Sequence, residues 1–168
     1  MKEKMLNHFM RLGPRRFVIG TVLLLLVTDL LNFYYLRLYW LKKDLSTNLV
    51  YQMIHRNGYL LENFSNETVT EMKTFVDNTF YFFLSIVLIN NLFFYFFYYR
   101  KKLWAQGFVL FYTLTASLLS VTYLLDLGLM GWSWSAYNFS TIFLYAYLFL
   151  GVKLLKYETT DAILPHEK

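Results

Sequence analysis

The chain has 168 residues, a length that suits one compact domain or a small helical bundle. Hydrophobic residues make up 57% of the chain and charged residues 16%, whereas soluble domains average about 45–50% and about 25%. This composition excludes a soluble enzyme and a disordered tail, and the lack of Cys excludes a disulfide scaffold, a thiol nucleophile and a thiolate metal site.

Four apolar stretches are long enough to cross a bilayer, which takes roughly 20 helical residues for ~30 Å of hydrocarbon. We therefore predict an all-α integral membrane protein that forms a single membrane domain over residues 1–168. Because only three residues separate the second and third stretches, the helices on either side should be antiparallel neighbours. The prediction is two antiparallel hairpins, with spans at about 17–40, 80–99, 103–125 and 137–155.

The first predicted span follows a basic N-terminal segment, as the apolar core of a secretory signal peptide does. Its apolar run is longer than that of a signal peptide and contains Asp29. It also ends in aromatic residues, where a signal peptide has small residues for cleavage. We therefore expect an uncleaved membrane anchor.

Basic residues flank the spans unevenly, which predicts their orientation. Five lie on the side of the long loop between the first two spans, where six of the eleven acidic residues, including Asp126, also fall. The other eleven lie at the two ends of the chain and in the turn between the second and third spans: Lys2, Lys4, Arg11, Arg15, Arg16, Arg100, Lys101, Lys102, Lys153, Lys156 and Lys168. We expect cytoplasmic termini and a bacterial inner membrane, and this pattern explains the net charge of +5 without a nucleic-acid partner.

The loop at about 42–79 is the only sizeable segment outside the predicted spans. Apolar residues recur in it at helical spacing, first around Leu49 and then around Met72. Asn57-Gly58 predicts a helix end, and Ser65 or Asn66 predicts the start of the next helix. We expect the first two membrane helices to continue outward as an amphipathic helical hairpin, which either packs only on itself or docks a partner protein.

A few polar residues interrupt the predicted spans. Asp29 is the most informative, because a carboxylate at the centre of a span costs roughly 2.5–3.5 kcal/mol and should face the interior of the bundle. The predicted intramembrane polar cluster is Asp29, Asn32, Asn90, Asn91, Ser117 and Ser120. Three interpretations stay open: hydrogen bonds between helices, contact with a second protein, or a proton- or cation-binding site.

The third span carries a stripe of polar and small residues along one helical face. Small residues four apart allow close approach of another helix, in this chain or in a partner. The stripe comprises Gln106, Thr113, Ala116, Ser117 and Ser120. The second span is aromatic nearly all round, which favours lipid contact.

No catalytic motif, phosphate-binding loop or metal-binding motif occurs, and His8, His55 and His166 are far apart in the sequence. We expect no cofactor, no metal and no enzymatic activity. The preferred function is an interaction or accessory subunit that works with another membrane protein or by self-association. One alternative is an ion or small-solute pathway centred on Asp29. Another is an immunity protein, because the chain is similar in size and four-span layout to immunity proteins against pore-forming bacteriocins.

Overall fold

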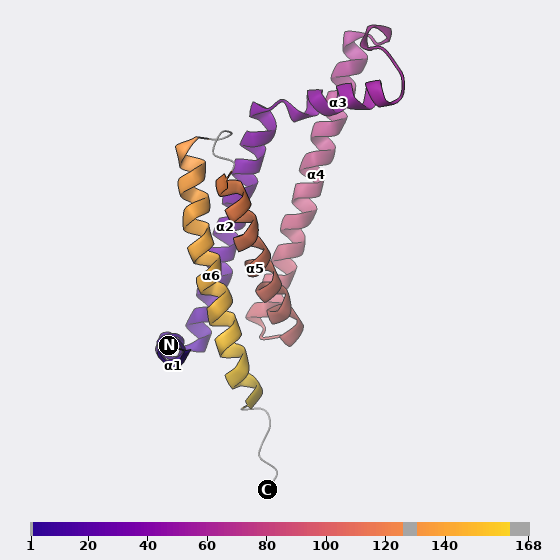
Figure 1. Cartoon of the computed structure of the whole chain (residues 1–168). Coiled ribbons are helices and arrows are strands. Elements are labelled where there is room, and N and C mark those ends of the chain that lie inside the picture. Colours follow the sequence, from indigo (N-terminus) through magenta and orange to yellow (C-terminus); the bar gives the residue numbers. More distant parts are fainter. Residues whose placement is uncertain (1, 126–130, 162–168) are drawn as a thin grey trace. The chain divides into compact units, whose positions relative to one another are not determined.

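The computed structural model describes residues 2–125 and 131–161, and within these residues every regular element is a helix (Figure 1). Asp126, Gly128, His166 and Lys168 lie outside the described residues. The predicted all-α fold is confirmed for the part described. In chain order the elements are α1 (Lys2–Leu12), α2 (Pro14–Lys42), α3 (Leu45–Arg56), the 3-10 turn η1 (Leu61–Asn63), α4 (Asn66–Tyr99), α5 (Leu103–Leu125) and α6 (Trp132–Asp161).

Four of these helices are long and apolar enough to cross a membrane, in agreement with the four apolar stretches of the sequence. They comprise Pro14–Lys42, Asn66–Tyr99, Leu103–Leu124 and Trp132–Leu155. The single membrane domain, the pairing of the helices as two hairpins and their insertion in a bilayer stay predictions.

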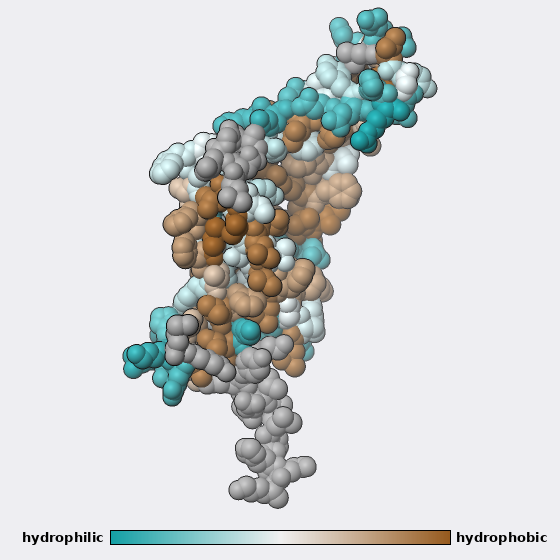
Figure 2. Space-filling model, viewed as in Figure 1, coloured by the Kyte–Doolittle hydropathy of each residue, from teal (hydrophilic) through white to brown (hydrophobic). Residues whose placement is uncertain are grey.

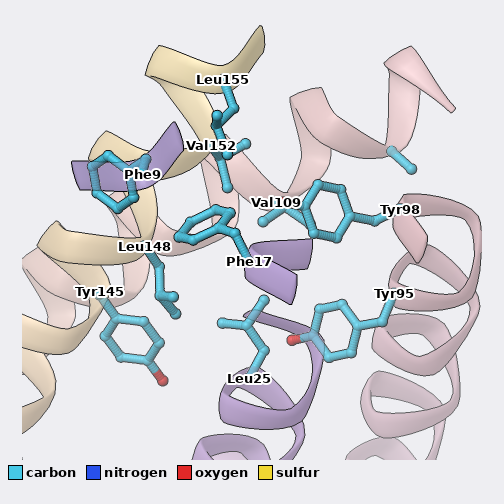
Figure 3. Close-up of a cluster of buried hydrophobic side chains, with 11 residues drawn as sticks. Phe9, Phe17, Leu25, Tyr95, Tyr98, Val109, Tyr145, Leu148, Val152 and Leu155 are labelled. Carbon is cyan, nitrogen blue, oxygen red and sulfur yellow. The ribbon is translucent and has the colours of Figure 1, made fainter. Parts of the chain in front are cut away.

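The chain divides into two compact units. The bundle unit consists of the residues up to Asp29 and from Asn91 onward, and the insert unit is Leu30–Asn90. The bundle unit therefore contains α1, the first half of α2, the end of α4, and both α5 and α6. Its core gathers large side chains from all five helices, among them Phe9, Phe17, Tyr98, Val109 and Val152 (Figure 3).

Helix α1 is a separate element that the apolar pattern did not predict. Gly13 has a φ of 84°, and its N–H donates to the Met10 carbonyl at 3.1 Å, which ends α1. Pro14 is the first residue of α2. A backbone N–H at this position has no partner within the helix, so proline, which lacks the N–H, costs no hydrogen bond there. The Gly-Pro pair was the local signal for this boundary.

A close approach to α6 holds α1 in place. The Phe9 ring, 1% exposed, meets the Phe17 ring edge-on with centroids 5.2 Å apart. A Cβ added to Gly151 of α6 would fall 2.8 Å from Phe9 Cε1 and would collide with the Phe17 ring. Gly151 therefore leaves the space that the two rings occupy.

In the insert unit, α2 does not continue outward as expected. It ends at Lys42, and Asp44 adopts the left-handed conformation with φ 45° before α3 begins. The break is accompanied by an ion pair, in which Lys73 Nζ donates to Asp44 Oδ1 at 2.8 Å. In contrast, α4 runs unbroken from Asn66 to Tyr99, as the extension of the second span predicts.

The helix ends expected in the insert unit are confirmed. α3 ends at Arg56, with Asn57 following it and Gly58 at φ 73°. The Ser65 Oγ accepts a hydrogen bond from the Thr68 N–H at 3.2 Å, so Ser65 caps α4. Both ends depend on local residue types, which explains why the sequence predicts them.

Within the insert unit, the Trp40 side chain of α2 packs tightly against α4. The Trp40 Nε1–H donates to Asp77 Oδ1 at 2.7 Å, and its ring stacks on Phe80 with centroids 3.8 Å apart. In α3, Val50 and Ile54 are buried, and Val50 lines a pocket together with Met72 and Val76 of α4. These contacts fix α3 and the end of α2 against the first half of α4.

Gly151→Ala should lower the stability of the full-length protein in detergent by about 1–3 kcal/mol, because the new Cβ overpacks the buried Phe17 ring. Gly107→Ala is the matched control, since a Cβ there meets nothing within 4 Å. The control should be neutral or stabilising by up to about 1 kcal/mol, because a glycine inside a helix is less favourable than an alanine by about that amount. Equal thermal unfolding curves for the two variants would contradict the packing of α1.

The Lys73 hydrogen bond holds the pKa of Asp44 below its ordinary value of 3.8. Since the folded pKa lies below the unfolded one, the stability that this group adds is present above the unfolded pKa and is lost as the pH falls through the folded pKa. Lys73→Met should raise the pKa of Asp44 toward 3.8, in a carboxyl NMR titration of the full-length protein. Lys42→Met is the control and should leave this pKa unchanged; an unchanged value in both variants would refute the pairing.

Candidate functional site

The candidate site is built around Asp29, in the middle of α2. Its side chain is 7% exposed, and it is the only buried side chain with a formal charge among those that the structure describes. The surrounding residues of α2 are mainly Leu, which favours the helix and offsets the cost of the carboxylate. A buried carboxylate is tolerated only where donors satisfy its oxygens.

Three donors from two other helices meet this carboxylate. Asn91 Nδ2 donates to Asp29 Oδ2 at 3.0 Å, and the Tyr95 hydroxyl donates to the same oxygen at 2.8 Å. The Tyr112 hydroxyl donates to Oδ1. Asn91 and Tyr95 are one turn apart on α4 and so share a face, while Tyr112 comes from α5. The carboxylate thus joins α2 to both α4 and α5.

The fourth long helix reaches the same region through the backbone of α2. The Tyr137 hydroxyl of α6 donates to the Thr28 carbonyl at 3.2 Å. The Tyr145 ring of α6 meets the Tyr112 ring edge-on at a centroid distance of 6.3 Å. All four long helices therefore contribute side chains at or beside Asp29.

The structure brings together part of the predicted polar cluster. Asn91 contacts Asp29, whereas its neighbour Asn90 is exposed. Asn32 is partly buried one turn further along α2. Ser117 is partly buried on α5. Ser120 belongs to a second hydrogen-bonded group, in which it accepts a bond from Thr141 Oγ1 of α6 at 3.0 Å.

The predicted packing stripe of α5 meets α6 at this second group. Thr113 is fully buried and donates to the Val109 carbonyl at 2.8 Å, and Ser120 donates to the Ala116 carbonyl at 2.9 Å. Gln106 Oε1 is buried and accepts no hydrogen bond within the part of the chain that is described. The close approach expected of the stripe is thus made within this chain at Ser120.

Sequence reasoning missed the two tyrosines that bind Asp29. The aromatic run of the second span favours lipid contact, yet Tyr95 is 1% exposed. Two signals were present in the sequence: a hydroxyl where the neighbouring positions have Phe, and a spacing of four from Asn91. Tyr112 offers a weaker signal, since nothing local links it to a carboxylate 83 residues away.

The chemistry of this site is that of a hydrogen-bond acceptor surrounded by neutral donors. Over residues 2–125 and 131–161, no group of three His, Asp, Glu or Cys side chains could hold a metal ion. The Asp29 carboxylate has both oxygens engaged, and its donors are two phenols and an amide. This arrangement suits a structural role, in which hydrogen bonds link one helix to its neighbours.

No protein-family model matches the chain, and neither a curated protein nor a solved structure matches it. Function can therefore be inferred only from the residues of the chain itself.

Tyr95→Phe and Tyr112→Phe should each lower stability by about 0.6–1.7 kcal/mol, the range of hydrogen bonds between membrane helices. Tyr99→Phe, at a position 47% exposed on α4, is the matched control and should have no measurable effect. A double-mutant cycle of Tyr95→Phe with Asp29→Leu, which removes both acceptor oxygens, is measured by unfolding in detergent. The double variant should lose less stability than the sum of the two single variants. Additive effects would show that the Tyr95 hydroxyl does not act on Asp29.

Proposed function

We propose that this chain is a non-enzymatic multi-pass membrane protein that acts as an interaction or accessory subunit of a membrane protein complex. The observation that carries the proposal is the state of Asp29, whose oxygens accept hydrogen bonds from Asn91, Tyr95 and Tyr112 of the same chain. Among the described residues Asp29 is the one buried charged side chain, and its hydrogen bonds serve the packing of the helices. The apolar outer surfaces of the helices therefore remain as the means of action.

Those outer surfaces are extensive. In the most apolar 18-residue stretch of α4, only 11% is buried within the chain, and the corresponding share for α5 is 17%. Large side chains on α4 point outward, including Phe82 at 63% and Ile89 at 65% exposure. Such a surface requires lipid or another membrane protein to cover it. In Figure 2, hydrophobic residues cover the middle of α5 and α6.

The proposed topology has two hairpins in a bacterial inner membrane, with both termini in the cytoplasm. The support is the grouping of Lys and Arg at the chain ends and in the 100–102 turn. The insert unit would then lie partly outside the membrane. It carries five of the eleven acidic residues, namely Asp44, Glu62, Glu67, Glu71 and Asp77. Its exposed side chains would be available to a partner.

An ion or proton pathway is the second candidate, because Asp29 and two phenols make a chain of groups that can exchange protons. A pathway needs a carboxylate that water or an ion can reach. The 7% exposure of Asp29 and its three donors favour the structural role.

The first test is purification of the tagged full-length protein in a mild detergent, followed by native mass spectrometry. We expect a complex of fixed stoichiometry with a second membrane protein or with further copies of this chain. To locate the contact, a photo-crosslinking residue replaces Phe82 or Ile89 in cells and should give a protein adduct. A monomer with no adduct at either position would overturn the proposal.

Reconstituted vesicles separate the second candidate from the first. Wild-type protein and Asp29→Asn should show the same low proton and cation flux. A flux that is present in the wild type and lost in Asp29→Asn, at equal reconstitution, would favour the pathway.

A further inference from the structure

We propose that one end of the bundle unit binds the headgroups of anionic phospholipids, with α1 as an interfacial helix. This inference rests on the proposed membrane location. We call the surface the basic rim and define it by its exposed residues Lys4, Arg11, Arg15, Arg16, Arg100, Lys101, Lys102 and Lys153.

The fold brings these residues to one end. Helix α2 begins there, α4 ends there and α5 begins there, as the buried Phe17, Tyr98 and Ala105 of one core cluster indicate. Val152 and Leu155, near the end of α6, belong to the same cluster (Figure 3). Each rim residue outside α1 lies within three positions of one of these core residues. Three chain segments that are distant in sequence, residues 4–16, 100–102 and 153, thus place their basic residues around one end of the core.

The rim carries little negative charge of its own. Glu3 is its one exposed acidic residue among the side chains described. The ion pair formed within residues 2–125 and 131–161 is Lys73 with Asp44, which belongs to the insert unit. The insert unit holds five basic and five acidic residues, whereas the rim has eight cations without a carboxylate partner in the described part of the chain.

Helix α1 combines these cations with exposed apolar side chains. Met10 is 41% and Leu12 is 40% exposed, on either side of Arg11. The face of α1 that carries Phe9 is fixed, because Phe9 is buried and His8 Nε2 lies 3.2 Å from the Tyr147 hydroxyl of α6. Figure 2 shows hydrophilic residues gathered over α1. A basic helix with apolar side chains at its edge is typical of the membrane interface.

This combination favours a lipid over a free phosphate ion. A phosphate needs only the cations, whereas Met10 and Leu12 gain nothing from it and would stay exposed to water. A phospholipid satisfies both, because its headgroup meets the cations and its acyl chains cover the apolar side chains.

The test uses full-length protein in detergent with equal amounts of dioleoyl phosphatidylglycerol and dioleoyl phosphatidylcholine, which share their acyl chains. Native mass spectrometry measures how much of each stays bound. Each cation near anionic lipid contributes about fivefold, so the wild type should retain at least about tenfold more phosphatidylglycerol. Arg11→Gln, Arg15→Gln and Arg16→Gln together should lower this ratio at least about fivefold, while the five remaining rim cations keep some preference for phosphatidylglycerol.

The matched control is Lys42→Gln, Lys43→Gln and Arg56→Gln, which removes three exposed charges from the insert unit. It should keep the wild-type ratio. Equal retention of both lipids by the wild type, or the same loss in both triple variants, would overturn the rim and leave the membrane location standing. Retention of neither lipid would count against the membrane location itself. Displacement of phosphatidylglycerol by excess inorganic phosphate would also overturn the lipid assignment.

A second pair of variants leaves every charge in place. Met10→Ser with Leu12→Ser should lower phosphatidylglycerol retention several-fold, because acyl contact at α1 is lost. Leu49→Ser with Met53→Ser, at positions 39% and 49% exposed on α3, should not. Unchanged retention of phosphatidylglycerol in the α1 pair would overturn α1 as an interfacial helix and would favour an acidic protein surface as the partner.

Discussion

A carboxylate in the middle of an apolar helix constrains everything packed around it. Asp29 can be buried only where donors satisfy its oxygens, and three of these donors lie on other helices. The donors come from Asn91 and Tyr95 on α4 and from Tyr112 on α5. The position of α2 relative to these two helices therefore depends on one side chain, and it specifies which faces of α4 and α5 turn inward.

The choice of donors bears on what this constraint is for. Each of the three is neutral, and among the described residues no cation pairs with Asp29. An amide and two phenols provide direction, since each O–H or N–H must point at a defined oxygen, while they add no opposite charge to the site. Such bonds are worth little individually between membrane helices, so their main effect is to select one register and rotation of the helices. That role fits a subunit whose outer surface must present a fixed shape.

Much of the fold could be predicted because its signals are local. The four long apolar runs, the Asn57-Gly58 helix end and the Ser65 cap each depend on a few consecutive residues. The predicted cluster around Asp29 included both Asn90 and Asn91, and the sequence alone did not say which of the two contacts the carboxylate. Tyr95 and Tyr112 were missed because a tyrosine in an aromatic run shows its partner only after the helices are packed. The break at Asp44 was missed for a similar reason, since its partner Lys73 lies on another helix. Helix α1 was missed although Gly13-Pro14 marks its end, because the basic residues before the first span already had an explanation in topology.

The core and the basic rim depend on the same contact. Phe9 and Phe17 fit beside α6 because Gly151 has no side chain there, and this fit turns α1 away from the axis of α2 at Gly13. If α1 instead continued α2 as one straight helix, Arg11 would lie about 6 Å further along the axis than Arg15. Phe9 would then have no core to enter. Holding α1 beside α6 keeps its cations at the same end of the core as those of the 100–102 turn and Lys153. The lack of a side chain at Gly151 thus determines the arrangement of the basic residues: either a row that leads away from the bundle or a rim around its end. Only the second arrangement places many cations at one depth, as a lipid headgroup layer requires.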